Sequence, residues 1–353
     1  MKILVVDDSI VFRSQISASL NGVENIEVVG SAANGKIALQ KLQQFDVDLI
    51  TLDMEMPEMG GLETIREMRR LGFKTKIIVF SSQTIRGAEK ALEALEAGAD
   101  DVIAKPSGDS MDFTKAQVMI EEALLPRINQ FLTGTRKFAS VPRPSLTQEK
   151  VPTKQRQKKS LRGFRPDALV IASSTGGPTA LENVFSKLSS VPKVPILIVQ
   201  HMPPVFTQIL AKRLGELSGI PFHEATHGQK VEAGHAYVAP GGFHMLLELR
   251  GKVPHIVLNE DPLRNSVRPA ADFLFETAAE IYRDRLLALV LTGMGEDGAV
   301  GASRVKDLDG GVIIQEKESC VVFGMPGAVF MNDDYDDIMN LGEISTYLKS
   351  VIA

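Results

Sequence analysis

Lys2-Ile3-Leu4-Val5-Val6-Asp7-Asp8-Ser9 is a short apolar run that stops at two adjacent acids. Three similar runs follow: residues 49–52 stop at Asp53, residues 77–80 at Ser81, and residues 102–104 at Lys105. Short apolar runs that alternate with helical patterns predict a parallel sheet buried on both faces. Because polar residues at the carboxyl ends of such strands converge in one crevice, we expect these side chains to lie together in an α/β fold.

The acids at these strand ends predict a phosphorylation site. The carboxylates of Asp7, Asp8 and Asp53 would repel one another without a cation, and ligands that are all oxygen favour Mg²⁺. Asp53 is then a candidate nucleophile of the aspartyl-phosphate kind. Lys105 would pair with the phosphoryl oxygens, and the Ser81 hydroxyl would hydrogen-bond to them. A single acid after a strand is often only a helix cap, but polar residues at four strand ends in order favour a shared site.

This arrangement resembles a response-regulator receiver domain over roughly residues 1–130, which implies a flavodoxin-like fold. The segments that fit the family closely are Thr51-Leu52-Asp53-Met54-Glu55-Met56-Pro57 and Ser81-Ser82-Gln83-Thr84. Val102, three residues before Lys105, replaces the aromatic switch residue that is usual in receivers. This departure leaves open how phosphorylation would reach an output surface.

The bulk composition predicts a globular protein with two domains. The chain has 353 residues, of which 44% are hydrophobic and 24% charged. No apolar stretch approaches the length of a membrane span and no signal-peptide pattern opens the chain, so we expect a cytoplasmic protein without direct membrane insertion. The single cysteine, Cys320, fits a reducing compartment. Because residues 319–322 are typical of a strand, we interpret Cys320 as an inert buried thiol rather than a nucleophile.

A basic segment separates the two predicted domains. Residues 134–165 carry ten Lys or Arg against one Glu, although the net charge of the chain is −5. We interpret residues 1–133 as the receiver domain, 134–165 as a basic flexible linker and 166–353 as a second domain. A basic run can also bind DNA. The prolines of this segment, the acidic domains on both sides and the lack of a helix-turn-helix pattern favour a linker and no nucleic-acid partner.

Strand and helix patterns alternate again in the second domain. We expect strands at residues 168–172, 195–199, 286–291 and 311–315, helices at 177–188, 206–217, 270–281 and after 298, and a hairpin of 245–249 with 253–258. This order predicts a doubly wound α/β domain with mostly parallel strands. The domain has neither a Walker A loop nor a G-x-G-x-x-G pattern, which gives nucleotide binding little support.

Three of these strands end at a serine pair, a histidine and the segment that leads to an aspartate. Ser173-Ser174, His201 and Asp297 could supply a nucleophile, its base and a group that orients the base. Taken singly, each residue has a structural interpretation as a helix cap or a hydrogen-bonded side chain. The rival bases are His223, His227, His235, His244 and His255. His201 is favoured by its position directly after a buried strand that neighbours the serine strand.

From end to end, the chain resembles the family of chemotaxis response-regulator protein-glutamate methylesterases. The matching segments are residues 174–177, 200–202, 239–244, 292–298 and 321–326. The resemblance implies that Ser174, rather than Ser173, is the nucleophile, that His201 is the base and that Asp297 orients it. It also implies an oxyanion hole formed by backbone amides near Thr175 and Met294. Ala172 and Ser173 depart from the Gly-Ala that commonly precedes the nucleophile, and Glu296 replaces a usual Asn.

The same resemblance implies the function and its partners. The expected reaction is hydrolysis of glutamate γ-methyl esters on methyl-accepting chemoreceptors, with glutamine deamidation as a second activity. A chemotaxis histidine kinase would supply the phosphoryl group, Mg²⁺ would serve the receiver, and the esterase would need no cofactor. A docked receiver could block the crevice until phosphorylation weakens docking. A non-catalytic binding module controlled by phosphorylation is the alternative.

Overall fold

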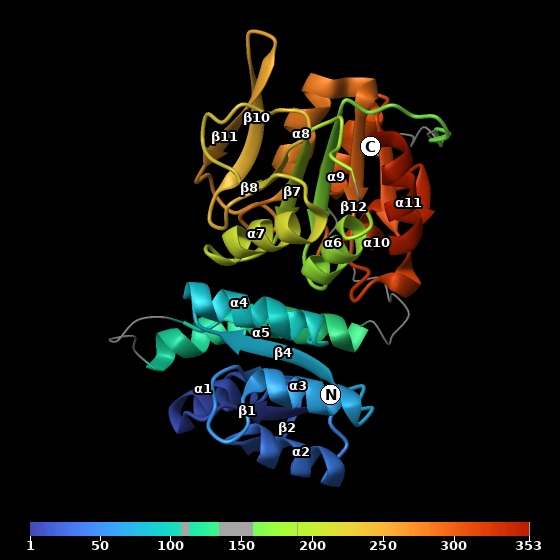
Figure 1. Ribbon diagram of the computed structural model, residues 1–353. Helices are drawn as coiled ribbons and strands as arrows, with labels where there is room; N and C mark the ends of the chain where they lie inside the picture. Colours follow the sequence, from blue (N-terminus) through green and yellow to red (C-terminus); the bar gives the residue numbers. More distant parts are fainter. Residues whose placement is uncertain (107–112, 134–157, 189, 353) are drawn as a thin grey trace, which may run out of the picture.

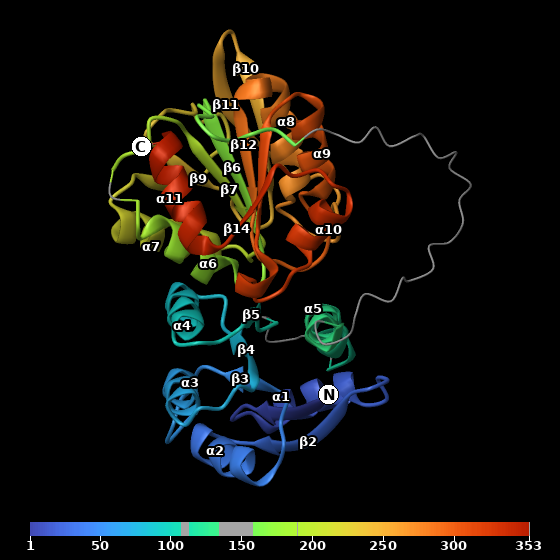
Figure 2. The same ribbon diagram turned by 90° about the vertical axis from the view of Figure 1, so that its right-hand side faces the viewer.

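The computed structural model describes residues 1–106, 113–133, 158–188 and 190–352. It consists of two α/β domains that contact each other through their helices (Figures 1 and 2). Most of the predicted linker, residues 134–157, lies outside the described residues. Its last part, residues 158–165, packs on the C-terminal domain, where the Lys159 amide donates to Asp336 at 2.6 Å. No described helix combines the length and the apolar character that a membrane crossing requires.

The N-terminal domain has one parallel sheet in the order β2-β1-β3-β4-β5. Its strands are β1 (Lys2–Val6), β2 (Glu27–Ala32), β3 (Leu49–Asp53), β4 (Lys76–Ser81) and β5 (Asp101–Ala104). Its helices are α1 (Ile10–Leu20), α2 (Gly35–Gln44), α3 (Gly61–Arg70), α4 (Ile85–Glu96) and α5 (Phe113–Thr133). Buried residues of α1 and α5 cover one face, while those of α2, α3 and α4 cover the other. The sheet is therefore buried on both sides, as its continuous apolar strands predict.

Polar side chains fix where the helices of this domain begin. Ser9, Asn34 and Thr84 occupy the N-cap positions of α1, α2 and α4, and each side chain accepts a hydrogen bond from a backbone amide of the first turn. These caps lie within a few residues of the strand ends. They start the helices next to the polar residues of the predicted crevice.

The C-terminal domain has a seven-stranded sheet in the order β14-β13-β12-β6-β7-β9-β8 and a separate hairpin, β10-β11. The strands are β6 (Ala168–Ser173), β7 (Ile196–Gln200), β8 (Phe222–Glu224), β9 (Ala236–Val238), β10 (His244–Arg250), β11 (Val253–Asn259), β12 (Leu286–Val290), β13 (Gly311–Gln315) and β14 (Asp337–Met339). All pairings within the large sheet are parallel. β6 lies at its centre, between β12 and β7.

Helices cover both faces of the large sheet. They are α6 (Gly177–Phe185), α7 (Phe206–Ser218), α8 (Ala271–Tyr282), α9 (Ala299–Asp307), α10 (Met325–Met331) and α11 (Leu341–Ile352), with 3₁₀ turns η1 (Arg283–Arg285) and η2 (Lys317–Ser319). Buried side chains of α6, α7 and α11 pack on one face, and those of α8, α9 and α10 pack on the other. Successive residues of β6 alternate between these two clusters, as the two-residue period of a strand requires.

The predicted doubly wound α/β fold is confirmed, and one predicted strand is wrong. The strands expected near 168, 195, 286 and 311 and the hairpin all form, with ends that differ by a few residues. Residues 319–322 are not a strand. Val322 instead exchanges hydrogen bonds with the Thr292 hydroxyl and accepts one from the Gly293 amide. This segment therefore crosses the end of β12 and holds the turn that follows it.

Helix α4 forms the contact between the domains and lies against α6 and α7 (Figures 1 and 2). Leu92 and Leu95 of α4 belong to the same contiguous cluster of buried apolar residues as Phe206 of α7. Polar contacts surround this cluster. Glu96 accepts a hydrogen bond from Arg213 at 2.6 Å, and Asp101 accepts one from Thr175 at 2.7 Å.

The central strands should dominate the stability of the C-terminal domain. Leu287 of β12 is fully buried, whereas Leu249 of the hairpin is 52% exposed. We expect Leu287→Ala to lower the free energy of unfolding by about 2–5 kcal/mol, because it leaves a cavity in the core. Leu249→Ala should change it by about 0.5 kcal/mol or less. Denaturant titration of the full-length variants measures both, and equal effects would contradict the burial pattern.

Candidate active site and phosphorylation site

Ser173 and Ser174 at the end of β6 have different environments. The Ser173 hydroxyl is fully buried and donates to Gln200 Oε1 at 2.7 Å. Ser174 is partly exposed, and its backbone amide donates to the Thr292 carbonyl oxygen at 3.1 Å. Among the described residues, none bonds the Ser174 hydroxyl. Of the two serines, Ser174 is therefore the one that can react with a bound molecule.

Two glycines make the turn after Ser174 possible. Gly176 has φ of 76°, in the left-handed region that a residue with a side chain seldom adopts. A Cβ atom on Gly177 would lie 2.0 Å from Gln200 Oε1. α6 can therefore begin directly against the end of β7 only because this position has no side chain.

His201 is the histidine that lies beside Ser174. Its Nε2 atom is 2.8 Å from Asp297 Oδ2, which leaves Nδ1 as the ring nitrogen able to take a serine proton. Ser174 and His201 line the same small cavity. The rival histidines have other partners: His223 and His235 contact each other, His227 and His255 contact backbone carbonyls, and His244 lies between the Ala270 amide and the Pro262 carbonyl.

Asp297 is 1% exposed, yet its carboxylate has several donors. It accepts from the amides of Ala271 and Asp272 at the start of α8 and from the side chains of His201 and Asn265. Burial by itself would raise the pKa of Asp297, but these hydrogen bonds hold it below the ordinary value. The alternative that Asp297 caps the following helix is wrong, because Gly298 is the N-cap residue of α9.

The backbone around Ser174 provides two candidate oxyanion donors. The amides of Thr175 and Met294 donate to no acceptor among the described residues. Gly293 packs so closely on Ser174 that a Cβ atom there would lie 2.8 Å from the serine Cβ. This contact brings the segment that contains Met294 next to the serine. The Thr175 side chain points elsewhere, to Asp101 of the receiver.

The predicted phosphorylation residues also lie together. Single carboxylate oxygens of Asp7, Asp8 and Asp53 all lie within 4.8 Å of one another. Lys105 Nζ is 2.8 Å from both Asp7 Oδ2 and Asp53 Oδ2. Burial raises the pKa of Asp53, while Lys105 opposes that change. A cluster whose ligands are all carboxylate oxygens fits a hard divalent cation such as Mg²⁺.

Ser81 is near this cluster but is bonded to another group. A cavity of about 240 Å³ is lined by Asp8, Asp53, Ser81 and Lys105, among others. The Ser81 hydroxyl is buried and donates to the Gly87 carbonyl oxygen in the first turn of α4, at 2.8 Å. To contact a phosphoryl group on Asp53, it would have to leave this acceptor.

The receiver covers the cavity that contains Ser174 and His201. Asp101, Val102 and Arg127 line one side of this cavity, whose volume is about 20 Å³. That volume is close to the minimum that holds one water molecule. Val102, which replaces the aromatic residue of other receivers, thus lies directly opposite the candidate active site.

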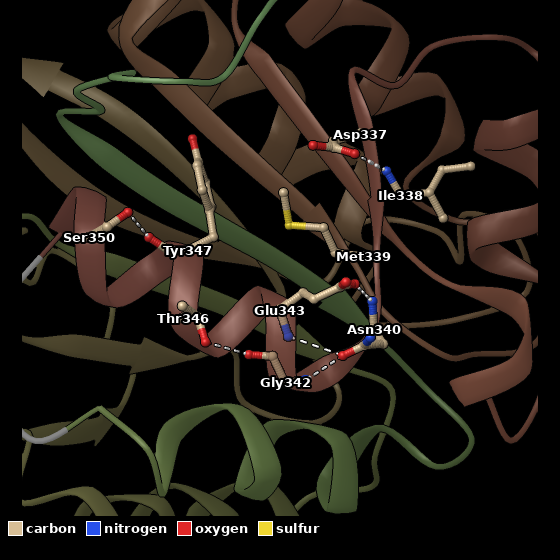
Figure 3. A pocket seen from close by; sticks show the side chains of 9 residues that line it. All are labelled: Asp337, Ile338, Met339, Asn340, Gly342, Glu343, Thr346, Tyr347 and Ser350. Carbon is tan, nitrogen blue, oxygen red and sulfur yellow. Dashed lines mark hydrogen bonds between the residues drawn. The ribbon is translucent and has the colours of Figure 1, made fainter.

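A larger groove on the C-terminal domain lacks such reactive residues. It lies along β14 and α11 and has a volume of about 640 Å³ (Figure 3). Its polar side chains serve the local backbone: Asn340 accepts from the Gly342 and Glu343 amides, and Glu343 accepts from the Asn340 amide. The polar side chains of this groove are therefore explained by the hydrogen bonds that begin α11.

Four polar residues of the site were not singled out from the sequence. Gln200 bonds Ser173 and the Ser174 carbonyl, Asp101 contacts Thr175, and Asn265 and Asp272 lie beside Asp297. The sequence could have indicated Gln200, because it is a polar residue that ends a buried strand just before His201. Asp101 lies far in sequence from Thr175, and Asn265 lies far from Asp297, so only the tertiary structure reveals these contacts.

Comparison with known families assigns both halves of the chain. Residues 169–348 match the family described as CheB methylesterase, and residues 3–116 match the response regulator receiver domain. A protein-glutamate methylesterase/protein-glutamine glutaminase from Trichodesmium erythraeum is 40% identical, over 98% of this chain and 97% of that protein. A relative with the same name from Thermotoga maritima is also 40% identical, over 96% and 94%.

A solved structure supports the assignment of the C-terminal domain. The crystal structure of the Thermotoga maritima CheB methylesterase catalytic domain has a TM-score of 0.51 and is 42% identical. It covers 53% of this chain and 99% of that chain. The agreement in fold and sequence thus extends over nearly the whole of that domain.

Cys320 should be chemically inert in the folded protein. Burial raises the pKa of its thiol to about 12, so the reactive thiolate is scarce at pH 8. We expect iodoacetamide to alkylate the native protein far more slowly than the protein unfolded in denaturant. Mass spectrometry of both samples at pH 8 measures the difference. Equal alkylation rates would instead mark Cys320 as an accessible thiolate.

Proposed function

Because the chain belongs to the CheB methylesterase family, we propose that it hydrolyses glutamate γ-methyl esters of chemoreceptors and that phosphorylation of its receiver activates it. The observation that supports this most directly is the short contact between His201 and the buried Asp297, beside the Ser174 hydroxyl, which no described residue bonds. The names of the relatives supply the ester substrate. The same machinery attacks a primary amide, which gives glutamine deamidation as a second activity.

The proposed reaction uses Ser174 as the nucleophile. Its oxygen attacks the ester carbonyl carbon while His201 Nδ1 takes the hydroxyl proton, and the Asp297 carboxylate stabilises the resulting imidazolium. The amides of Thr175 and Met294 donate to the oxyanion. The imidazolium then protonates the departing methoxide, which leaves as methanol. A water molecule, activated by His201, hydrolyses the acyl-enzyme to the glutamate carboxylate and restores Ser174.

Loss of the nucleophile should abolish turnover. We expect Ser174→Ala to reduce methanol release from methylated chemoreceptors by about 10³-fold or more, because no acyl-enzyme can form. Ser186→Ala is the matched control, since Ser186 is an exposed residue at the end of α6. Methanol release by the two purified variants and the wild type decides the assignment. Substantial activity of Ser174→Ala would favour another nucleophile or the alternative of a binding module.

We propose that the receiver inhibits the esterase by covering it. The cavity of about 20 Å³ leaves no room for a glutamyl ester, whereas a receptor helix would need the whole crevice. Asp101, Glu96 and the apolar residues of α4 hold the receiver in this position. Docking and catalysis then exclude each other, so the activity depends on the fraction of undocked molecules.

Phosphorylation of Asp53 is the proposed release signal. When bound, Mg²⁺ would be held by Asp7, Asp8 and Asp53 and would neutralise the charge of the incoming phosphoryl group. Lys105 would pair with the phosphoryl oxygens, and Ser81 would give up Gly87 to donate to them. Because Gly87 and Glu96 belong to opposite ends of α4, this change reaches the helix that contacts α6 and α7. A chemotaxis histidine kinase is the expected phosphodonor.

Weaker docking should raise the basal activity. We expect Asp101→Ala to increase methanol release up to about tenfold, because it removes the acceptor of Thr175 and a weakening of ~1.4 kcal/mol shifts the equilibrium tenfold. Deletion of residues 1–140 should give a larger increase. Glu67→Ala is the matched control, since Glu67 pairs with Arg70 on α3. An unchanged or lower rate in both Asp101→Ala and the deletion would count against autoinhibition.

A further inference from the structure

The loop before α8 contains a two-residue turn with an unusual backbone. Asn265 and Ser266 have φ of 53° and 63°, and Arg264 and Val267 bond each other through both backbone pairs. Positive φ at both central residues is the requirement of a type I′ turn, where Asn and Gly are preferred. Ser is an unfavourable choice for the second position. Strain of this kind often accompanies a functional constraint.

The side chain that this turn presents, Asn265, contacts two buried acids. Its Nδ2 atom lies 2.9 Å from Asp297 Oδ1 and 2.9 Å from Asp272 Oδ2. The two hydrogens of one amide group thus bridge two carboxylates that are each no more than 1% exposed. Asp297 is the carboxylate that contacts His201, so the bridge lies one hydrogen bond away from the candidate base.

The second carboxylate is a fixed structural group. Asp272 accepts from the Gly301 amide of α9 at 2.7 Å and lies 3.4 Å from Arg264 Nε. Arg264 also pairs with Glu276 through two bonds of 2.7 and 2.6 Å and packs over the ring of Phe273. Both ends of the bridge are therefore held by α8, and the turn that carries Asn265 is anchored to the same helix.

We propose that Asn265 is a positioning residue that keeps Asp297 oriented and ionised beside the negative charge of Asp272. This inference rests on the proposed esterase function and deepens it. Two carboxylates this close disfavour each other's charge, and burial strengthens the effect. The amide places a hydrogen of partial positive charge on each of them. Its loss makes the electrostatic potential around His201, Asp297 and Asp272 more negative, so each of these groups takes up a proton at higher pH.

The charged and titratable groups near the bridge come from several elements of the domain. They are His201, Asp297, Asp272, Arg264, Glu276 and, farther away, His244 and Arg268. Burial, and next the charge of Asp297, raise the pKa of Asp272. Asp272 and Asp297 therefore disfavour each other's charge. The two hydrogen bonds of Asn265 lie where they oppose this effect.

The test compares two glycine substitutions in the same turn. Asn265→Gly removes the bridge while glycine keeps the positive φ, and Ser266→Gly keeps the bridge and relieves the backbone. The titration of His201 is followed by NMR of the full-length protein labelled in its histidines, with His201→Gln to identify the signal. We expect the titration midpoint of His201 to move to higher pH in Asn265→Gly and to match the wild type in Ser266→Gly.

A third variant separates electrostatics from shape. Asn265→Asp keeps the size of the side chain, but a carboxyl group can donate to at most one of the two carboxylates, so this variant should shift the titration of His201 in the same direction as Asn265→Gly. In the methanol assay, kcat of Asn265→Gly should fall about tenfold with KM unchanged, since the residue does not touch the substrate. The acidic limb of the kcat/KM profile should move to higher pH.

The outcomes distinguish this inference from the function on which it rests. A pKa of His201 that is identical in the wild type and Asn265→Gly would overturn the positioning role, whatever happens to kcat. A wild-type protein that releases no methanol would count against the esterase assignment instead. The titration needs no turnover, so it still tests the bridge in that case.

Discussion

A buried negative charge organises the catalytic domain. A carboxylate with almost no exposure to water is stable only where donors replace the water it loses. Asp297 obtains these donors from the first turn of α8, from His201 after β7 and from Asn265 in the preceding loop. The donors come from three parts of the chain, so satisfying this one charge fixes the positions of β7, α8 and the loop relative to β12.

The two domains solve a similar electrostatic problem in different ways. Both gather acids at the carboxyl ends of parallel strands. In the receiver, Lys105 and the expected cation offset the charges, and the cluster remains open to a ligand on the side of Asp8. In the catalytic domain, backbone amides, the Asn265 side chain and Arg264 surround the acids. The first arrangement suits reversible phosphorylation, and the second suits a charge that must stay constant during a reaction.

The sequence predicted the fold well, and it singled out the residues that the structure brings together at the ends of the strands, because both depend on local patterns. A window of a few residues is enough to recognise a continuous apolar strand, the polar residue at its end and the glycines after Ser174. Ser173 and Ser174 could be separated only by resemblance, whereas the structure separates them by the bond from Ser173 to Gln200. The strand predicted at residues 319–322 failed because tertiary contacts with Thr292 and Gly293 outweigh the strand propensity of its valines. Asn265 and Asp101 act over long sequence separations, which no local pattern records.

The cover over Ser174 has a consequence for timing. His201 and Asp297 already contact each other in the docked arrangement, and the Ser174 turn is already held by Gln200. Under the proposed switch, no bond within the catalytic domain has to be rearranged before the first turnover. The response would then be as fast as two rigid bodies can separate, and it would end as soon as they meet again. The docked protein would thus hold a fully assembled active site that the receiver covers. The active state would last only as long as the phosphoryl group stays on Asp53.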